Sequence, residues 1–249
     1  MSSRFYLYGF LEGESPVNWG PIGIDGKEVF TLIYDGLAVA VSETDKKVID
    51  PLRDYLLTHQ QALSTIMKNY ELAPVSFGTV VQSRKKLNEL VSKMHPQLIE
   101  LLAKVKNRVE LGLKVFWTAE SFQEEMEQSS SEISRLKKQI REIGSDKAQQ
   151  RYNLAVELGE KVESLANSKR EEYKTKIFTP LGNMAADSKL NDLTNEKMII
   201  NASFLVDKDK ENDFDMAVDA IYQKYRQSLQ FKYSGPWPAY SFTQTVIKE

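Results

Sequence analysis

Histidine is the side chain best suited to acid–base chemistry near neutral pH, and this chain contains two, His59 and His95. His59 follows the spacing of an apolar helix face that includes Tyr55 and Leu63. No carboxylate or second histidine lies four residues to either side, where a catalytic pair or a metal site on a helix would need one. We therefore expect the His59 ring to pack partly into the core. His95 precedes Pro96, where an exposed polar residue is expected.

Other catalytic and cofactor motifs are absent from the sequence. The chain has no cysteine, which excludes disulfides, thiolate catalysis and cysteine-ligated metal sites, and fits a reducing cytosol. The glycines between Gly20 and Gly26 lack the Gly-Lys-Ser/Thr of a phosphate loop, and no helical pattern follows them. Hydrolase, zinc-protease and calcium-loop signatures are also missing. We expect no catalytic residue, no cofactor, no metal and no enzymatic activity.

Charge and hydropathy narrow the classes of partner. The net charge of -2 gives no overall basic field for nucleic acid or an anionic membrane. The aromatic stretch at 5–10 could stack on bases, but its basic flank is limited to Arg4, so we do not expect RNA binding. No apolar run reaches the length of a membrane span, and no secretory leader pattern occurs. The sequence predicts a soluble, cytoplasmic protein without a lipid partner.

The first part of the chain predicts an α+β domain over residues 1–105. Strands are expected at 5–10, 29–34 and 37–42, in one sheet, with Asp35-Gly36 forming a tight hairpin. A helix opened by Asp50-Pro51 should cover that sheet. Residues 72–81 are expected to form one strand at an edge of the sheet or beside a bulge, because they contain a proline and a glycine. Ser83 caps a further helix that His95-Pro96 breaks or kinks before it continues to residue 105.

Residues 107–117 alternate apolar and polar side chains with a clean period of two, which predicts a long central strand. Its odd-numbered residues, from Val109 to Trp117, should face a core covered by helices. Glu110 and Lys114 lie on the other face, where we expect polar contacts and no catalysis.

Residues 118–175 predict a helical arm with narrow apolar stripes. The first limb is interrupted at 129–131, and Gly144-Ser145-Asp146 stops it and caps a second limb, whose stripe runs from Tyr152 to Tyr173. Two such limbs form a coiled-coil-like αα-hairpin, each about 35 Å long at 1.5 Å per residue. The charged runs are expected to be solvated helix faces. The alternative is that the arm docks a protein partner.

The C-terminal part completes a second domain, 106–249. Strands at 197–206 and 229–233 flank a helix whose apolar face runs from Phe214 to Tyr225. With the central strand they resemble a ferredoxin-like split βαβ unit whose first helix is expanded into the hairpin. The fold class is thus α+β, with two small mixed or antiparallel sheets covered by helices. The aromatic tail, 234–249, either packs back over the protein or presents its rings to a partner.

Four segments resemble the GvpF/GvpL family of gas vesicle proteins, in the family's order. They are residues 5–9 (Phe-Tyr-Leu-Tyr-Gly), 73–80 (Ala-Pro-Val-Ser-Phe-Gly-Thr-Val), 109–117 (Val-Glu-Leu-Gly-Leu-Lys-Val-Phe-Trp), and 204–206 (Phe-Leu-Val) with 235–242 (Gly-Pro-Trp-Pro-Ala-Tyr-Ser-Phe). Ala73 stands where leucine is expected, and Ala239 where a third proline is common. Both departures affect packing only.

The resemblance implies a non-enzymatic accessory or minor structural protein that binds the small hydrophobic shell protein during gas vesicle assembly. Other gas vesicle accessory proteins are further implied partners, and the implied location is the cytoplasm, on or in the vesicle. The alternative is a small-ligand-binding enzyme or regulatory domain on a ferredoxin-like fold. Nine residues in these segments are candidates for partner contact or family-specific packing: Tyr8, Phe77, Gly78, Glu110, Lys114, Trp117, Trp237, Tyr240 and Phe242.

Overall fold

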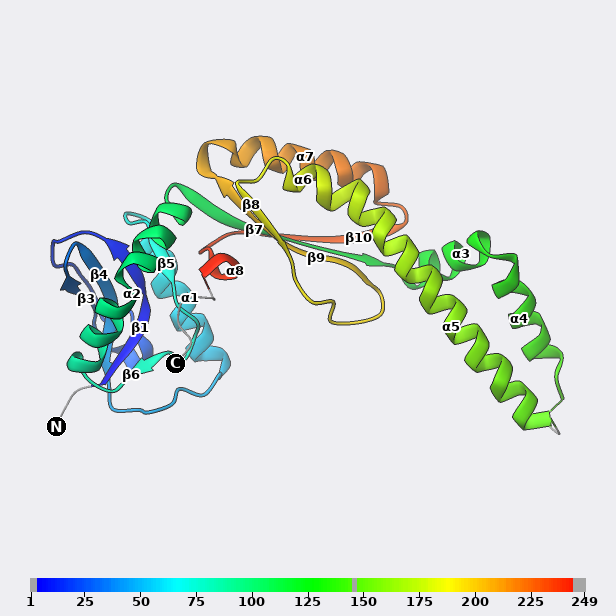
Figure 1. Ribbon diagram of the computed structural model, residues 1–249, viewed down its shortest axis with the longest axis horizontal. Helices are drawn as coiled ribbons and strands as arrows, with labels where there is room; N and C mark the ends of the chain where they lie inside the picture. The colour runs from blue at the N-terminus through cyan, green and yellow to red at the C-terminus, as the bar shows by residue number, and fades with distance from the viewer. Residues whose placement is uncertain (1–3, 145–146, 244–249) are drawn as a thin grey trace. The chain divides into compact units, whose positions relative to one another are not determined.

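A computed structural model describes residues 4–144 and 147–243 of the chain (Figure 1). The backbone groups into two compact units. Within the described residues, the first unit comprises 4–111, 205–208 and 235–243, and the second comprises 112–204 and 209–234. The described part of the aromatic tail thus groups with the first unit, although the sequence assigned it to the second domain. The boundaries 1–105 and 106–249 stay predictions.

The first unit is built on a six-stranded sheet in the order β2-β3-β4-β1-β5, with β6 also paired to β1. Its strands are β1 (Arg4–Glu12), β2 (Asn18–Gly20), β3 (Val29–Tyr34), β4 (Leu37–Thr44), β5 (Leu72–Pro74) and β6 (Val80–Val81). The predicted hairpin between β3 and β4 is confirmed. Its turn residues Asp35 and Gly36 have φ of 46° and 79°, the left-handed pair that a two-residue hairpin requires.

The prediction of one strand over 72–81 is wrong. β5 and β6 are separate short strands that both pair with β1. Between them Gly78 has a φ of 85°, and the Thr79 N–H and hydroxyl both donate to the Ser76 carbonyl, which turns the chain out of the extended conformation. The predicted edge position is confirmed for β5, which ends the strand order.

Both faces of the sheet are covered by helices, so β1 is buried on both sides. A bulge in β1 between Leu7 and Gly9 resets its alternation. Phe5, Leu7 and Phe10 therefore belong to the core cluster that contains the apolar residues of α2 (Arg84–Val105). Tyr6, Tyr8 and Leu11 belong to the cluster that contains those of α1 (Arg53–Met67). A side chain at Gly9 would lie 2.6 Å from the Ala73 carbonyl oxygen, which explains the glycine.

The two long helices differ in detail from expectation. α1 begins at Arg53, after Leu52, so Asp50-Pro51 lie just ahead of it. Ser83 caps α2 by accepting a hydrogen bond from Lys86 N, as predicted. The predicted break at Pro96 does not occur, because α2 is a single helix over 22 residues. Packing of apolar residues on both sides of the proline, such as Val91 and Leu98, stabilises the continuous helix.

The second unit contains most of a four-stranded sheet in the order β10-β7-β9-β8. Its strands are β7 (Arg108–Trp117), β8 (Asp187–Leu190), β9 (Met198–Asp207) and β10 (Leu229–Trp237). β7 is interior, as predicted, and its odd-numbered residues from 109 to 117 are all buried. β8 was missed because it lies in a polar stretch, and β10 extends four residues beyond the predicted strand at 229–233.

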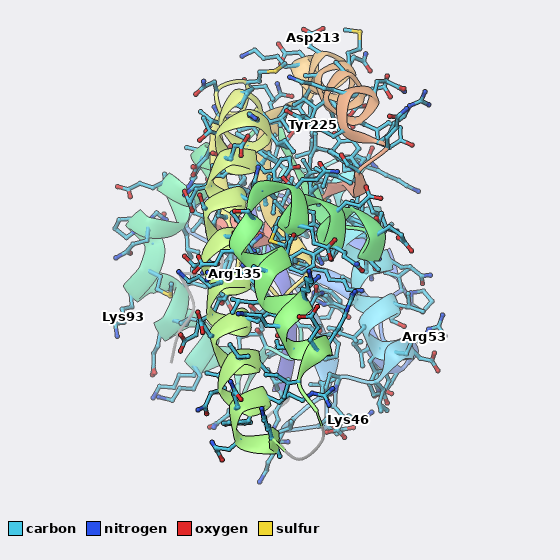
Figure 2. All side chains as sticks on the ribbon, turned by 90° about the vertical axis from the view of Figure 1, so that its right-hand side faces the viewer. Lys46, Arg53, Lys93, Arg135, Asp213 and Tyr225 are labelled. Carbon is cyan, nitrogen blue, oxygen red and sulfur yellow. The ribbon has the colours of Figure 1, made fainter. Side chains whose placement is uncertain are left out.

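The helical arm consists of α3 (Ala119–Ser129), α4 (Ser131–Glu142) and α5 (Ala148–Tyr173), with α4 beside α5 in Figure 2, where Arg135 marks α4. The first limb is two helices, since Ser130 is extended and its hydroxyl accepts from Ile133 N, which starts α4 anew. The second limb continues through a π-turn (Lys174–Phe178) into α6 (Thr179–Gly182). The predicted place of Tyr152 in the arm's apolar stripe is wrong, because its side chain is 64% exposed.

The remaining elements are α7 (Glu211–Tyr225), α8 (Tyr240–Thr243), and the 3-10 turns at Ile24–Gly26 and Lys208–Lys210. α7 buries Phe214 and Val218, two residues of the predicted face. The α+β class with two sheets and covering helices is confirmed. In the described part of the chain, no helix has both the length and the apolarity to span a bilayer.

Replacing Leu113 with alanine should lower the free energy of unfolding by about 2–5 kcal/mol, because a fully buried side chain leaves a cavity in the interior of the sheet. Lys114→Ala, at the adjacent exposed position, is the matched control and should change it by about 0.5 kcal/mol or less. Urea denaturation followed by circular dichroism measures both. Equal effects would contradict the assignment of the two faces.

Candidate functional site

Five rings from separate parts of the chain form an aromatic cluster in the first unit: Tyr6, Tyr8, His59, Phe77 and Tyr240. The His59 ring stacks on Tyr8 at a centroid distance of 5.6 Å and an interplanar angle of 18°. Tyr6 and Phe77 meet His59 edge-on at 5.6 and 5.7 Å, and Tyr240 lies 6.3 Å away. Three of the nine sequence candidates, Tyr8, Phe77 and Tyr240, thus surround the one histidine of α1.

His59 is more deeply buried than the sequence suggested, at 3% exposed. Its Nδ1 shares a 2.8 Å hydrogen bond with the Tyr6 hydroxyl. Burial lowers the pKa of His59 to about 4 and outweighs the opposing effect of the Val75 backbone. The Nε2 atom has no hydrogen-bond partner among the described residues. The imidazole is therefore neutral at physiological pH and serves as a packed hydrogen-bonding ring.

The tyrosines of the cluster are held as neutral phenols. Burial is the main cause that raises the pKa of Tyr6, Tyr8 and Tyr240, and the Glu110 carboxylate adds to the rise for Tyr240. The Tyr8 hydroxyl accepts from Ile24 N at 3.0 Å and bonds the Ser42 hydroxyl at 3.2 Å. These bonds tie the 3-10 turn and β4 to β1.

Gly78 supplies a backbone contact to the cluster. Its N–H donates to the Tyr6 hydroxyl at 3.3 Å, and its φ of 85° is one that glycine adopts without strain. The neighbouring Phe77 ring stacks edge-on against Tyr6 at 6.3 Å. The Phe-Gly segment therefore closes the cluster on the side of β5 and β6.

Glu110 anchors the C-terminal segment within the first unit. Glu110 lies on β7 and is 7% exposed. Its carboxylate accepts hydrogen bonds from Ser241 N at 2.7 Å and from the Ser241 hydroxyl at 2.5 Å. Phe242 is buried in the core cluster, with the Lys104 ammonium 5.5 Å from its ring centroid. The Thr243 hydroxyl donates to the Pro74 carbonyl. Residues 241–243 thus each pack against or bond to the rest of the first unit.

A second polar cluster fixes the base of the arm in the second unit, and Glu125 of α3 is its centre. The Glu125 carboxylate accepts from Trp117 Nε1 at 2.8 Å and from the Tyr173 hydroxyl at 3.2 Å, and pairs with Lys169 at 3.4 Å. Arg170 lies over the Trp117 ring and donates from Nε to the Met198 carbonyl. Burial, followed by Glu125, raises the pKa of Tyr173. This joint links β7, α3 and α5.

The glycine-rich loop at 20–26 does not form a phosphate site. It borders an open hollow of about 840 Å³ whose other wall is the flank of α1, and Lys68 is its one charged lining residue within the described chain. A helix N-terminus offers free backbone N–H groups to a phosphate, and the helix flank that lines this hollow offers none. The loop is held instead by Asp25, which pairs with Lys46 and accepts from Tyr55.

Seven of the nine sequence candidates lie in the first unit: Tyr8, Phe77, Gly78, Glu110, Trp237, Tyr240 and Phe242. Trp117 lies in the second unit and is 2% exposed, Lys114 is exposed on β7, and Trp237 at the end of β10 is 36% exposed. Their role in partner contact stays a prediction.

Sequence reasoning missed Tyr6, Glu125 and Tyr173, and it did not identify His59 as the centre of a cluster. The Tyr6 and His59 partners are 53 residues apart, and Glu125 and Tyr173 are 48 apart, so no local period joins them. The one sequence feature that could have indicated Tyr6 was the aromatic run at 5–10, in which Tyr6 and Tyr8 lie on the same face of a strand. Among described residues, no group of three or more histidines and carboxylates could hold a metal ion.

Comparison with known proteins identifies the family. The family model for gas vesicle synthesis protein GvpL/GvpF matches residues 4–244, nearly the whole chain. The chain belongs to the GvpL/GvpF family. Gas vesicle protein F of Nostoc sp. is 29% identical over 98% of this chain and 99% of its own length. Gas vesicle protein F1 of Halobacterium salinarum is 26% identical over 99% of this chain and 96% of its own.

Solved GvpF structures share the fold. The crystal structure of GvpF from Anabaena sp. is similar to this chain with a TM-score of 0.83 and 27% identity, over 100% of both chains. The crystal structure of GvpF from Microcystis aeruginosa has a TM-score of 0.76 over 97% of this chain and 99% of its own. The resemblance read from four sequence segments is confirmed at the level of the family and of its gas vesicle role.

The burial of His59 predicts a specific pH dependence. An unfolded histidine titrates near 6.5 and this one near 4, so the unfolded chain binds the extra proton between these values. The stability due to neutral His59 is complete above pH 6.5 and is lost as the pH falls towards 4, by about 3 kcal/mol. Urea unfolding from pH 7 to pH 4 should show a shallower decline for His59→Phe than for the wild type. His95→Gln is the control and should retain the wild-type slope.

Loss of Glu110 should release the C-terminal segment. Glu110→Ala removes the acceptor of two hydrogen bonds from Ser241, so the free energy of unfolding should fall by about 1–3 kcal/mol. Amide exchange at residues 240–243 should accelerate more than exchange in α1. Glu110→Gln retains one acceptor oxygen and should be intermediate. Glu100→Ala, at an exposed site on α2, should have no effect. Unchanged exchange in Glu110→Ala would refute the anchoring role.

Proposed function

We propose that this chain is a non-enzymatic gas vesicle accessory protein that binds the small hydrophobic shell protein and assists vesicle assembly. We place it in the cytoplasm, associated with the gas vesicle, with the shell protein and other gas vesicle accessory proteins as partners. Membership of the GvpL/GvpF family supports the general role. The polar side chains of the two clusters described above already bond within the protein, which favours a binding role over catalysis.

One observation carries the partner contact: an exposed apolar pair on the arm. Tyr152 and Val156 lie four residues apart, so they share one side of α5, and they are 64% and 44% exposed. α5 spans 26 residues, which gives about 39 Å of helix. Other apolar residues of the arm, such as Ile133 of α4 and Ala166 of α5, are buried by contrast. An exposed apolar pair of this kind is suited to a hydrophobic partner.

We infer further that the strands of the second sheet follow the ferredoxin-like pattern. The chain order is strand, helical arm, two strands, helix, strand, which is the β-α-β-β-α-β sequence of that motif. The strand order β10-β7-β9-β8 supports this inference. The packing of α4 on α5 supports a short coiled-coil-like contact within the arm. The arm would then be an elaboration of the motif's first helix.

Co-expression with the shell protein, followed by pull-down at several salt concentrations, tests the proposal. The shell protein should co-purify at high salt as well as at low salt, because apolar contacts are not screened by ions. Failure to co-purify under every salt condition would exclude the proposed function. Retention at low salt alone would point to a charged contact and contradict the apolar one.

A matched pair of variants tests the arm. Tyr152→Ser combined with Val156→Ser should reduce shell protein recovery at least about fivefold, because it removes roughly 1 kcal/mol or more of apolar contact. Met216→Ser on α7 is the control, since Met216 is as exposed as Tyr152, at 64%. It should leave recovery unchanged. Equal recovery of the shell protein with both variants would show that Tyr152 and Val156 do not form the contact.

A further inference from the structure

A small aromatic pocket in the first unit has no role in the clusters described above. It has a volume of about 230 Å³ and lies between the end of β1, the loop at 12–17, β2 and Tyr70. Leu11, Val17 and Ala38 form its apolar lining, together with the rings of Trp19 and Tyr70. Pockets for drug-sized ligands usually measure about 300–1,000 Å³, so this one suits a smaller group such as a single side chain.

Hydrogen bonds from backbone N–H groups hold the walls of the pocket in place. Val17 N donates to the Thr31 hydroxyl at 2.8 Å, and Thr31 N donates to the Val17 carbonyl at 2.9 Å. Gly13 N donates to the Gly36 carbonyl at 3.1 Å. The loop is thus tied to β3 and to the β3–β4 turn, so the pocket is preformed and a ligand needs little ordering of the protein.

The two rings in the pocket form an edge-to-face pair. The centroids of Trp19 and Tyr70 are 5.7 Å apart with an interplanar angle of 86°. Both side chains are half-buried, which leaves part of each ring accessible. Other rings of the described chain, such as Tyr55 and Trp117, have a lysine or arginine over them, but no described cation lies over Trp19 or Tyr70. Tryptophan and tyrosine faces attract cations through their negative quadrupole.

The rim of the pocket carries an excess of negative charge. Two carboxylates, Glu12 and Glu14, are among the lining residues, and no basic residue of the described chain is. Glu12 is neutralised by Lys106 at 2.9 Å. Glu14 is exposed, and it forms no ion pair with any residue that the structure describes. One uncompensated carboxylate therefore stands beside two aromatic rings.

We propose that this pocket binds the side chain of a lysine or arginine projecting from a partner protein. The aliphatic stem would pack on the apolar lining, and the cationic end would contact the Trp19 and Tyr70 rings and the Glu14 carboxylate. A free amine of this size has too few atoms for useful affinity, whereas a side chain on a protein gains from the contacts around it. The site is separate from the apolar pair on the arm and does not depend on the proposed function.

Fluorine NMR of protein labelled with 5-fluorotryptophan tests the pocket directly. The chain has three tryptophans, so Trp19→Phe assigns the Trp19 resonance. Titration with acetyl-Gly-Lys-Gly-amide should shift that resonance saturably and leave those of Trp117 and Trp237 in place. The arginine peptide should act likewise. The norleucine peptide has the same stem without the charge and should bind at least about fivefold more weakly, the loss expected for one cation–π contact.

Two variants of similar exposure separate the pocket from general charge attraction. Glu14→Gln should weaken lysine peptide binding at least about threefold, and Glu28→Gln, an exposed glutamate outside the pocket, should leave it unchanged. Tyr70→Leu should weaken binding further, with a thermal melt to confirm folding. The proposal fails if the Trp19 resonance does not shift with either cationic peptide at about 20 mM, because a dissociation constant above that concentration is too weak to contribute to recognition. It also fails if norleucine binds equally well, or if the two glutamate variants behave alike.

Discussion

Strand β1 is buried on both faces, and this constraint determines what the rest of the first unit must provide. Seven consecutive residues, 5–11, are all buried. A strand of this kind needs a helix on each side, and the chain supplies α1 and α2. The bulge before Gly9 lets the four aromatic residues of this short strand divide evenly between two cores. The tyrosines on the α1 side then need partners for their hydroxyls, because a buried polar atom without one is costly.

These buried hydroxyls and carboxylates are where distant parts of the chain are tied together. Tyr6 bonds His59 of α1, Tyr8 bonds Ile24 N, and Glu110 bonds the C-terminal segment through Ser241. Glu125 has the same role for the arm. The partners are 8 to 131 residues apart in the sequence, and each bond uses a charged or aromatic side chain. The polar groups of these clusters therefore serve to position segments of the chain.

The sequence was informative wherever local pattern decides structure. A period of two found β7 and the first part of β10, a strongly apolar run found β9, Asp35-Gly36 located the hairpin, and Ser83 marked the start of α2. It failed where tertiary packing overrides local signals. α2 continues through Pro96 because its flanking residues are buried, and β8 is polar yet pairs with β9. The aromatic cluster was out of reach for a different reason: it joins β1 to His59 on a helix about fifty residues later in the chain, and no spacing rule links residues so far apart.

Two proposed recognition surfaces lie outside the hydrogen-bonded clusters, and they differ in physical character. Tyr152 and Val156 offer apolar area on a helix, so their contribution should grow with the area a partner covers and vary little with salt. The Trp19 pocket offers a ring pair and one carboxylate, so it selects charge more than area. An apolar partner gains nothing from the uncompensated Glu14, and a lysine gains little from Tyr152 in the absence of a carboxylate. The two surfaces therefore suit different partner chemistries, which separate experiments can resolve.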